Sequence, residues 1–320
     1  MPNHGSKKSK IQADMAKIIV ITGGTGGIGY QVALELSKSP GNTVVITGRS
    51  QGSGDKAVAA IKEASGNANV HLALGDLSLQ SDVKKLAADL LTRFPKIDVL
   101  CNNAGNLSSV KENRPQTSEG VEKNFAVNVI APLLLTRLLV PALKAASPVG
   151  NVLITSGGTP FPSLNVKDLE ASSQGMGIPS YSHSKRAMEA MAFSLGKELA
   201  SDAIAVNIAG GGNPGATSMT ADISCSDLPC IMRPIYPCFK CFMHRDDGGA
   251  SARACAAVTV WAASTPTAEL GTGQYYFAQP NKKVAIPKPA LDEANQAEVM
   301  AFCDSKMAGG GGPVAVEIGR

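Results

Sequence analysis

Tyr181 and Lys185 are the pair of residues in this chain whose types and spacing could do chemistry. A phenol titrates near ~10, so it exchanges protons near neutral pH only when a neighbouring cation favours its ionised form. Positions four apart on a helix share one face, so Lys185 would lie beside Tyr181 and supply that cation. The competing interpretation is an amphipathic helix with a half-buried tyrosine and a solvated lysine, because this spacing by itself is common.

A glycine-rich turn far upstream adds a second element. The run at 17–21 is apolar and β-branched, as in a strand, and TGGTGGIG at 22–29 follows it and opens a helical stretch to about residue 38. Glycines there let the backbone approach a pyrophosphate, while the helix N-terminus offers unpaired N–H groups and a partial positive charge. A turn of this kind between a strand and a helix indicates a dinucleotide site. Together with the tyrosine and lysine pair it suggests hydride transfer.

Several short motifs follow one another along the chain. They are TGGTGGIG at 22–29, Asp76-Leu77, Asn102-Asn103-Ala104-Gly105, Asn128 within a Val-Asn-Val run, and Tyr181 with Lys185. In this order they resemble the short-chain dehydrogenase/reductase family, and more narrowly its retinol-dehydrogenase-like branch. The resemblance runs from about Lys17 to about Met307, and it implies a Rossmann fold and a nicotinamide cofactor.

The resemblance also implies which residues hold the cofactor. Asp76 would bond the adenine amino group with Leu77 adding a backbone contact, and the turn at 102–105 would line the adenosine ribose. That turn also stabilises the sheet core in the family. The expected cofactor-binding residues are Gly23, Thr25, Gly27, Ile28, Gly29, Arg49, Asp76, Leu77, Asn102, Ala104, Gly105, Tyr181, Lys185 and Thr217.

The end of the second predicted strand favours NADP(H) over NAD(H). A ribose 2′-hydroxyl typically meets a carboxylate there, whereas a 2′-phosphate is better accommodated by arginine. The chain carries Thr47-Gly48-Arg49-Ser50, with no acid at that place. The competing interpretation is that Arg49 is a solvated loop residue, and Gly26 stands where many NADP-preferring relatives carry a basic residue.

The catalytic roles follow from the same resemblance. Tyr181 would give a proton to a carbonyl oxygen or take one from an alcohol, Lys185 would lower the pKa of Tyr181 and hold the nicotinamide ribose, and Asn128 would hold a water in the proton relay. The family also uses a serine that bonds the substrate oxygen, and aligned without a gap its position is Gly157. We expect Ser156 to take this role, with Thr155 and Thr159 as alternatives.

The alternation of patterns predicts an α/β fold with a doubly wound, mostly parallel sheet. Proline at 132 and 141 should kink or break the longest helix. Strands are expected at 17–22, 43–47, 70–74, 97–101, 150–155, 203–208 and 273–277, and helices at 28–38, 55–65, 79–94, 117–146, 180–200 and 249–264.

Composition fits one domain. The 320 residues are 44% hydrophobic, which suffices for one large core, and we expect a disordered leader at 1–16, a domain at 17–307 and a flexible tail at 308–320. The leader lacks the apolar region of a secretory signal, and no apolar stretch reaches the ~20 residues that span a bilayer, so we expect a cytoplasmic protein. The family resemblance implies a monomer or a homodimer. A net charge of +4 is too small to indicate nucleic acid.

The segment at about 218–247 is expected to form the substrate lid. Its apolar and aromatic side chains would cover a lipophilic substrate, or face a membrane or a partner. Its four cysteines, at 225, 230, 238 and 241, are followed by His244, but their spacings lack the paired C-x-x-C of strong zinc sites, so we expect no metal. Just before it, Gly210-Gly211-Gly212-Asn213 lengthens the loop that leads to Thr217, our candidate for the nicotinamide amide or phosphate contact.

These patterns support an NADP(H)-dependent oxidoreductase acting on a carbonyl compound or an alcohol. One alternative is a catalytically weak nucleotide-binding subunit with the same fold, which Gly157 and the altered loop favour and the tyrosine, lysine and Asn128 oppose. Another is reduction of an activated C=C bond. The substrate and the reaction direction are not determined by the residues.

Overall fold

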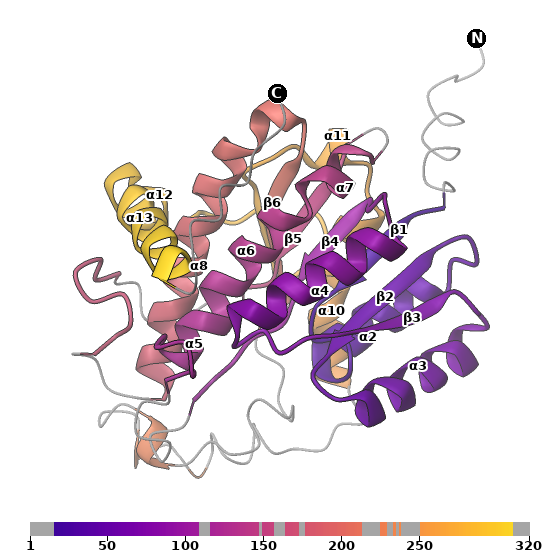
Figure 1. Ribbon diagram of the computed structural model, residues 1–320, viewed down its shortest axis with the longest axis horizontal. Coiled ribbons are helices and arrows are strands. Elements are labelled where there is room, and N and C mark those ends of the chain that lie inside the picture. The colour runs from indigo at the N-terminus through magenta and orange to yellow at the C-terminus, as the bar shows by residue number, and fades with distance from the viewer. Residues whose placement is uncertain are drawn as a thin grey trace.

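One parallel sheet organises the chain (Figure 1). The computed structural model describes residues 16–108, 116–146, 149–156, 164–172, 177–212, 225–228, 233–234, 237 and 250–309. Within these residues, seven strands pair in the order β3-β2-β1-β4-β5-β6-β7, and every pairing is parallel. The strands are β1 (Ile18–Ile21), β2 (Thr43–Gly48), β3 (Val70–Leu74), β4 (Val99–Asn102), β5 (Asn151–Ile154), β6 (Ala205–Gly210) and β7 (Tyr275–Phe277).

Helices cover both faces of this sheet (Figure 1). The longer ones are α2 (Gly27–Ser37), α3 (Gln51–Ser65), α4 (Gln80–Arg93), α6 (Ala131–Leu138), α8 (Ile178–Glu198), α10 (Ala250–Ser264) and α13 (Glu293–Gly309). The shorter ones are α5 (Lys123–Phe125), α7 (Val140–Lys144), α11 (Thr267–Leu270), α12 (Lys288–Leu291), the π-helical turn η2 (Ala126–Ile130) and the 3₁₀ turns η3 (Ala200–Asp202) and η4 (Cys225–Asp227).

Side chains of each strand alternate between two cores, because successive strand residues point to opposite faces. Val152 and Ile154 of β5 pack with α4, α6 and α8, whereas Leu153 packs with α2 and α10. All three are fully buried. This accounts for the continuous apolar runs of the strands, which is typical of a parallel sheet covered on both faces. The predicted doubly wound α/β fold is confirmed.

The helix predicted at 117–146 is broken, as its prolines indicated. Pro132 lies in the first turn of α6 and Pro141 in the first turn of α7, where a missing backbone N–H is tolerated. The helical segment also begins later than predicted, at Lys123, because the chain turns at Gly120, whose φ is +74°. The π-helical turn η2 lies between α5 and α6.

The sequence patterns missed helix α13. Its buried residues Val299, Cys303 and Met307 recur every four positions, which is a helical signal, and they join the core on the α8 side. The helix includes residues 308 and 309, so it overlaps the start of the predicted tail. The leader, the rest of the tail and most of the lid at 218–247 lie outside the described residues.

The carboxyl ends of the parallel strands meet along one edge of the sheet. The strand order reverses between β1 and β4, and ligands of such sheets bind in the crevice outside this point. The glycine-rich turn follows β1 and the turn at 102–105 follows β4, so the two lie side by side at this edge. Among the described residues, no helix combines the length and the apolar composition that crossing a membrane requires.

Candidate active site

The glycine-rich turn leads from β1 into the uncapped N-terminus of α2, while the N–H groups of Gly23 and Gly24 donate to Thr47. Gly23 and Gly27 have φ values of +67° and +55°, which favour glycine, and no side chain caps the N-terminus of α2. A Cβ added at Gly29 would lie 2.5 Å from Asn103 Nδ2 and closer still to the Gly23 carbonyl oxygen. The turn is therefore closed against the helix, and its N–H groups fit a pyrophosphate.

Thr22 joins this turn to the turn after β4. The backbone N–H groups of Asn103 and Ala104 each donate to Thr22 Oγ1 at 3.0 Å. The Asn103 side-chain amide donates to the Thr22 carbonyl at 3.0 Å. Neither Thr22 nor Asn103 was predicted as a site residue, although both belong to the motifs that carried the resemblance. They hold the two cofactor-facing turns in one arrangement.

The predicted adenosine contacts divide into surface and interior positions. Gly105 is exposed and Ala104 is half-buried, so a ligand can reach both. Asn102 is buried and donates from Nδ2 to Thr136 Oγ1 at 3.1 Å, which favours its role in the sheet core. Asp76 is half-buried and accepts a hydrogen bond from the Ser78 backbone at 2.9 Å. Their contacts with a cofactor stay predictions, as does that of Leu77, which packs against the core.

Arg49 follows β2 at the same edge of the sheet. Its side chain is exposed, and the first turn of the helix that follows, α3, carries no acidic residue. A Cβ added at Gly48 would lie 2.6 Å from Thr25 Cγ2, so the glycine-rich turn packs against the end of β2. Arg49 is thus placed beside the turn that would hold the pyrophosphate.

Tyr181 and Lys185 share one face of α8, as their spacing predicted. Lys185 Nζ lies 5.8 Å from the centroid of the Tyr181 ring and donates to the Thr155 carbonyl at 3.2 Å. Burial raises the pKa of Tyr181 to about 12 and lowers the pKa of Lys185 to about 8. Burial is the cause that acts on the phenol in the protein without cofactor, and the expected lowering of the tyrosine pKa by Lys185 stays a prediction.

Asn128 lies in the π-helical turn η2 and connects α8 to the loop after β4. Its Oδ1 accepts from the Asn106 backbone N–H at 2.8 Å, and its Nδ2 donates to the Asn106 carbonyl at 3.0 Å and to Ser184 Oγ at 2.9 Å. The side-chain amide is thus used by protein partners. Its predicted role in holding a water is not tested by these contacts. π-Helical turns are frequent at functional sites.

Asn124, which the sequence patterns did not single out, extends this network. Its Oδ1 accepts from Asn106 Nδ2 at 2.8 Å and from the Ser108 backbone N–H at 2.9 Å. Its Nδ2 donates to Ser180 Oγ at 3.1 Å, one residue before Tyr181. The network therefore fixes the start of α8 against the cofactor edge of the sheet.

Comparison with known proteins identifies the family. The family described as short chain dehydrogenase matches residues 17–226. The chain belongs to this family. Human dehydrogenase/reductase SDR family member 12 is 35% identical over 155 residues, 48% of this chain and 47% of the relative. Mouse retinol dehydrogenase 12 is 31% identical over 183 residues, 57% of each chain. The chain spans about half the length of the curated relatives it matches.

Solved structures support the fold. L-Sorbose reductase from Gluconobacter frateurii, complexed with NADPH and L-sorbose, has a TM-score of 0.58 at 22% identity, covering 83% of this chain and 95% of that one. A 3-ketoacyl-(acyl-carrier-protein) reductase from Brucella melitensis, complexed with NADH, has a TM-score of 0.57 at 21% identity, covering 84% and 99%. At these identities the likeness concerns the fold alone.

Ser156 differs from our expectation for the substrate-binding serine of this family. It is fully buried, and its hydroxyl donates to Glu189 Oε1 at 2.8 Å. The Thr155 hydroxyl is also buried and makes no hydrogen bond among the described residues. Neither hydroxyl is free at the surface of the site, because the strand end is packed beneath α8. Gly157, Thr159 and Thr217 lie outside the described residues.

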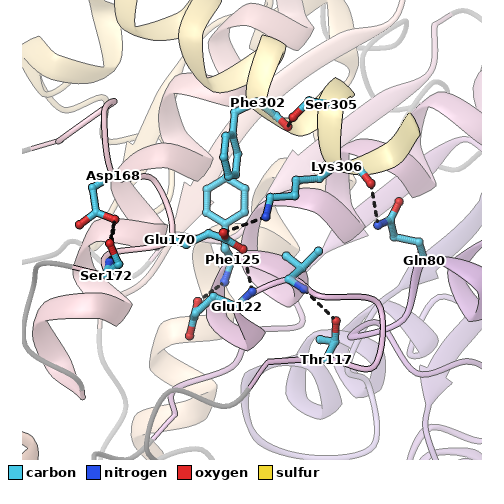
Figure 2. A network of polar contacts seen from close by, with 11 residues as sticks. Gln80, Thr117, Glu122, Phe125, Asp168, Glu170, Ser172, Phe302, Ser305 and Lys306 are labelled. Atoms are coloured by element: carbon cyan, nitrogen blue, oxygen red, sulfur yellow. Dashed lines mark hydrogen bonds and ion pairs between the residues drawn. The ribbon is translucent and has the colours of Figure 1, made fainter. Parts of the chain in front are cut away.

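A segment at 164–172 borders the site, and Figure 2 shows its contacts with the start of α5 and with α13. Glu170 accepts from the Glu122 backbone N–H at 2.9 Å and pairs with Lys306 of α13 at 2.8 Å. The Asn165 backbone N–H donates to Nε2 of His183, on the catalytic helix, at 3.0 Å. Beside them, the rings of Phe125 and Phe302 meet edge to face, with centroids 5.3 Å apart. Helix α13 therefore helps to hold the segment against α5 and α8.

The expected absence of a metal in the lid stays a prediction. Cys225 is described, whereas the other three lid cysteines and His244 lie outside the described residues. Within the described residues there is no group of three or more metal-ligating side chains.

Proposed function

We propose that the chain is an NADP(H)-dependent oxidoreductase that moves a hydride between nicotinamide and a carbonyl group or a primary or secondary alcohol. The observation that carries the proposal is the placement of Tyr181 and Lys185 on one face of α8, with the Lys185 ammonium bonded to the Thr155 carbonyl at 3.2 Å. The glycine-rich turn at the carboxyl edge of the same sheet is the matching cofactor cradle. Membership of the short-chain dehydrogenase family supports both assignments.

Tyr181 would manage the proton in this reaction. The nicotinamide, when bound, supplies or accepts the hydride. With a pKa of about 12, the Tyr181 phenol is protonated at neutral pH and suited to donate to a carbonyl oxygen. Lys185, with a pKa of about 8, is mostly protonated at pH 7 and keeps a positive charge beside the ring. These protonation states are the ones that proton donation to a carbonyl oxygen requires.

Arg49 supports NADP(H) as the cofactor. Its exposed guanidinium follows β2, and no acidic side chain occupies the first turn of α3. A guanidinium binds a phosphate through charge and paired hydrogen bonds, whereas a ribose hydroxyl is better met by a carboxylate. Replacing Arg49 by glutamate should therefore weaken NADPH binding more than NADH binding. Equal losses for the two cofactors would contradict the assignment.

A lipophilic substrate is the class that the lid sequence and two relatives support. The apolar residues at 218–247 suit such a compound. Relatives of this chain include proteins named retinol dehydrogenase 12 and polyprenol dehydrogenase. We therefore propose a lipophilic aldehyde, ketone or alcohol.

A second candidate is a nucleotide-binding subunit with weak turnover. The bond of Ser156 to Glu189 favours it, together with glycine at position 157. Loss of one donor to a developing oxyanion raises a reaction barrier by roughly 2.7–4 kcal/mol. The two candidates thus differ in turnover and agree in cofactor binding.

NADPH oxidation by the purified protein separates them. The assay uses a panel of aldehydes, ketones and retinoids, with NADPH binding measured in parallel by fluorescence. The Tyr181→Phe variant, which lacks only the phenolic oxygen, is the matched control. Turnover that disappears in this variant supports the oxidoreductase, while NADPH binding without turnover of any compound supports the subunit.

A further inference from the structure

Glu189 is a buried carboxylate that has no part in the reaction as described so far. It lies on α8 four residues after Lys185, so Tyr181, Lys185 and Glu189 follow one face of the helix. Its exposed fraction is 0%. A buried carboxylate is costly unless hydrogen bonds and opposite charges compensate it. The partners of this carboxylate therefore indicate its role.

Three side chains meet at Glu189, two from the sheet layer and one from α8 itself. The hydroxyl of Ser156, just after β5, donates to Oε1 at 2.8 Å, and the hydroxyl of Tyr275, in β7, donates to the same oxygen at 3.0 Å. The guanidinium of Arg186, on α8, forms an ion pair with Oε2. Glu189 thus joins the catalytic helix to two strands of the sheet.

Lys185 binds the same end of β5. Its ammonium donates to the carbonyl of Thr155, the residue immediately before Ser156. Two neighbouring residues of the strand end are therefore held by two residues of one helix face, Thr155 by Lys185 and Ser156 by Glu189. The bond of Ser156 to Glu189 is thus one of the contacts that position the Thr155 carbonyl, beside the bond of the Thr155 backbone N–H to the Asn102 carbonyl at 3.0 Å.

We propose that Glu189 is a positioning residue: its carboxylate anchors the end of β5 through Ser156 and balances the buried positive charge of Lys185, which itself serves the cofactor and Tyr181. The expected effect of Glu189 on turnover rests on the proposed function. Its effects on the end of β5 and on the pKa of Lys185 do not.

The charges around Glu189 support this role. Burial lowers the pKa of Lys185, and the charge of Glu189 opposes that change. Burial raises the pKa of Glu189 itself, and Arg186, the hydroxyls of Ser156 and Tyr275, and Lys185 oppose it. Among the described residues these are the groups that act on the carboxylate, from α8, β5 and β7. They act against the effect of burial on Glu189, and a negative charge on Glu189 favours the charged form of Lys185.

The variant Glu189→Gln tests the charge. Glutamine keeps an acceptor oxygen for the two hydroxyls and removes the negative charge. Lys185 should then lose its proton more easily, so the alkaline limb of the kcat/KM profile should move down by about one pH unit, a tenfold change in the protonation ratio. Tyr275→Phe is the matched control, because it removes one neutral hydrogen bond and leaves the charge, and its alkaline limb should stay in place.

The conservative variant Glu189→Asp tests the anchor. Aspartate keeps the charge but is one methylene shorter, so it should lose its reach to Ser156. We expect the alkaline limb within about 0.3 pH unit of wild type, with kcat lowered several-fold. This variant keeps the inference testable if Glu189→Gln does not fold, since an unchanged kcat in Glu189→Asp overturns the anchoring role.

A measurement without cofactor separates this inference from the proposed function. The Cε chemical shift of Lys185 in protein labelled with ¹³C-lysine, assigned by its loss in Lys185→Met, reports the titration of Lys185 directly. A downward shift in Glu189→Gln supports the role of Glu189 even if the wild-type protein does not oxidise NADPH. The same midpoint in folded Glu189→Gln and wild type, or an equal shift in Tyr275→Phe, overturns it.

Discussion

Gly29 offers the sharpest test of how the glycine-rich turn is built. In Gly29→Ala the new Cβ would lie 2.5 Å from Asn103 Nδ2 and nearer to the Gly23 carbonyl, whereas real Cβ contacts stay above 3.0 Å. The neighbouring atoms must therefore retreat by at least 0.5 Å, the difference between 3.0 and 2.5 Å. Overpacking of this kind costs about 1–3 kcal/mol, and the lower entropy of alanine in the unfolded chain offsets roughly 0.4–1 kcal/mol. The net loss should be about 1–2 kcal/mol.

Thermal unfolding of the protein without cofactor measures this loss. We expect Tm to fall by about 2–4 °C in Gly29→Ala, from roughly 2 °C per kcal/mol for a chain of this size. Gly26→Ala is the matched control, because its φ of −171° is extended backbone and a Cβ there meets no atom within 4 Å. NADPH affinity should also fall in Gly29→Ala, since the carbonyl that must move belongs to the turn. Equal Tm values for the two variants would refute the close approach that we describe.

Three further predictions concern contacts beside the site. Thr22→Val removes an acceptor of two partly buried N–H groups, those of Asn103 and Ala104, and the Asn103 N–H keeps the Cys101 carbonyl at 2.9 Å. The loss in urea denaturation should be about 0.5–1.5 kcal/mol, and no measurable loss contradicts the link. Burial lowers the pKa of His183 below its ordinary value of 6.5, so the folded state binds fewer protons than the unfolded chain and stability should fall as the pH drops below 6.5. The plot of Tm against pH should be flatter in His183→Gln, and an unchanged slope argues against the effect. Lys306→Met removes the partly exposed ion pair with Glu170, worth about 0–1 kcal/mol, and should speed limited proteolysis within 164–172 with little change in Tm; an unchanged cleavage rate contradicts the role of α13.

The sequence predicted the fold well because strands and helices have local signals. Apolar, β-branched runs indicated the strands, and the prolines at 132 and 141 indicated where the long helix breaks. The boundaries were less accurate, as at Gly120, where a turn delays the helix to Lys123. The sequence patterns did not predict helix α13, although Val299, Cys303 and Met307 have a helical spacing. Polar and charged residues alternate with the apolar ones along this segment, which weakens the apolar pattern.

Some features of the site also follow from local spacing, whereas others depend on contacts between distant parts of the chain. Tyr181 and Lys185 share a helix face because positions four residues apart on a helix lie on the same side. The bond of Ser156 to Glu189 joins positions 33 apart, and that of Tyr275 to Glu189 joins positions 86 apart. No local pattern indicates such pairs, because they depend on which strands lie beneath α8.

By itself, the sequence determined the doubly wound fold, the glycine-rich turn and the helix face that Tyr181 and Lys185 share, since each follows from short-range spacing and backbone geometry. Only the tertiary structure decided what surrounds them. It placed Thr22 between two turns that are 81 residues apart, and it turned Ser156 toward Glu189. It also set the pKa of Tyr181 near 12, because burial depends on the packing of the whole domain and not on the neighbouring lysine alone.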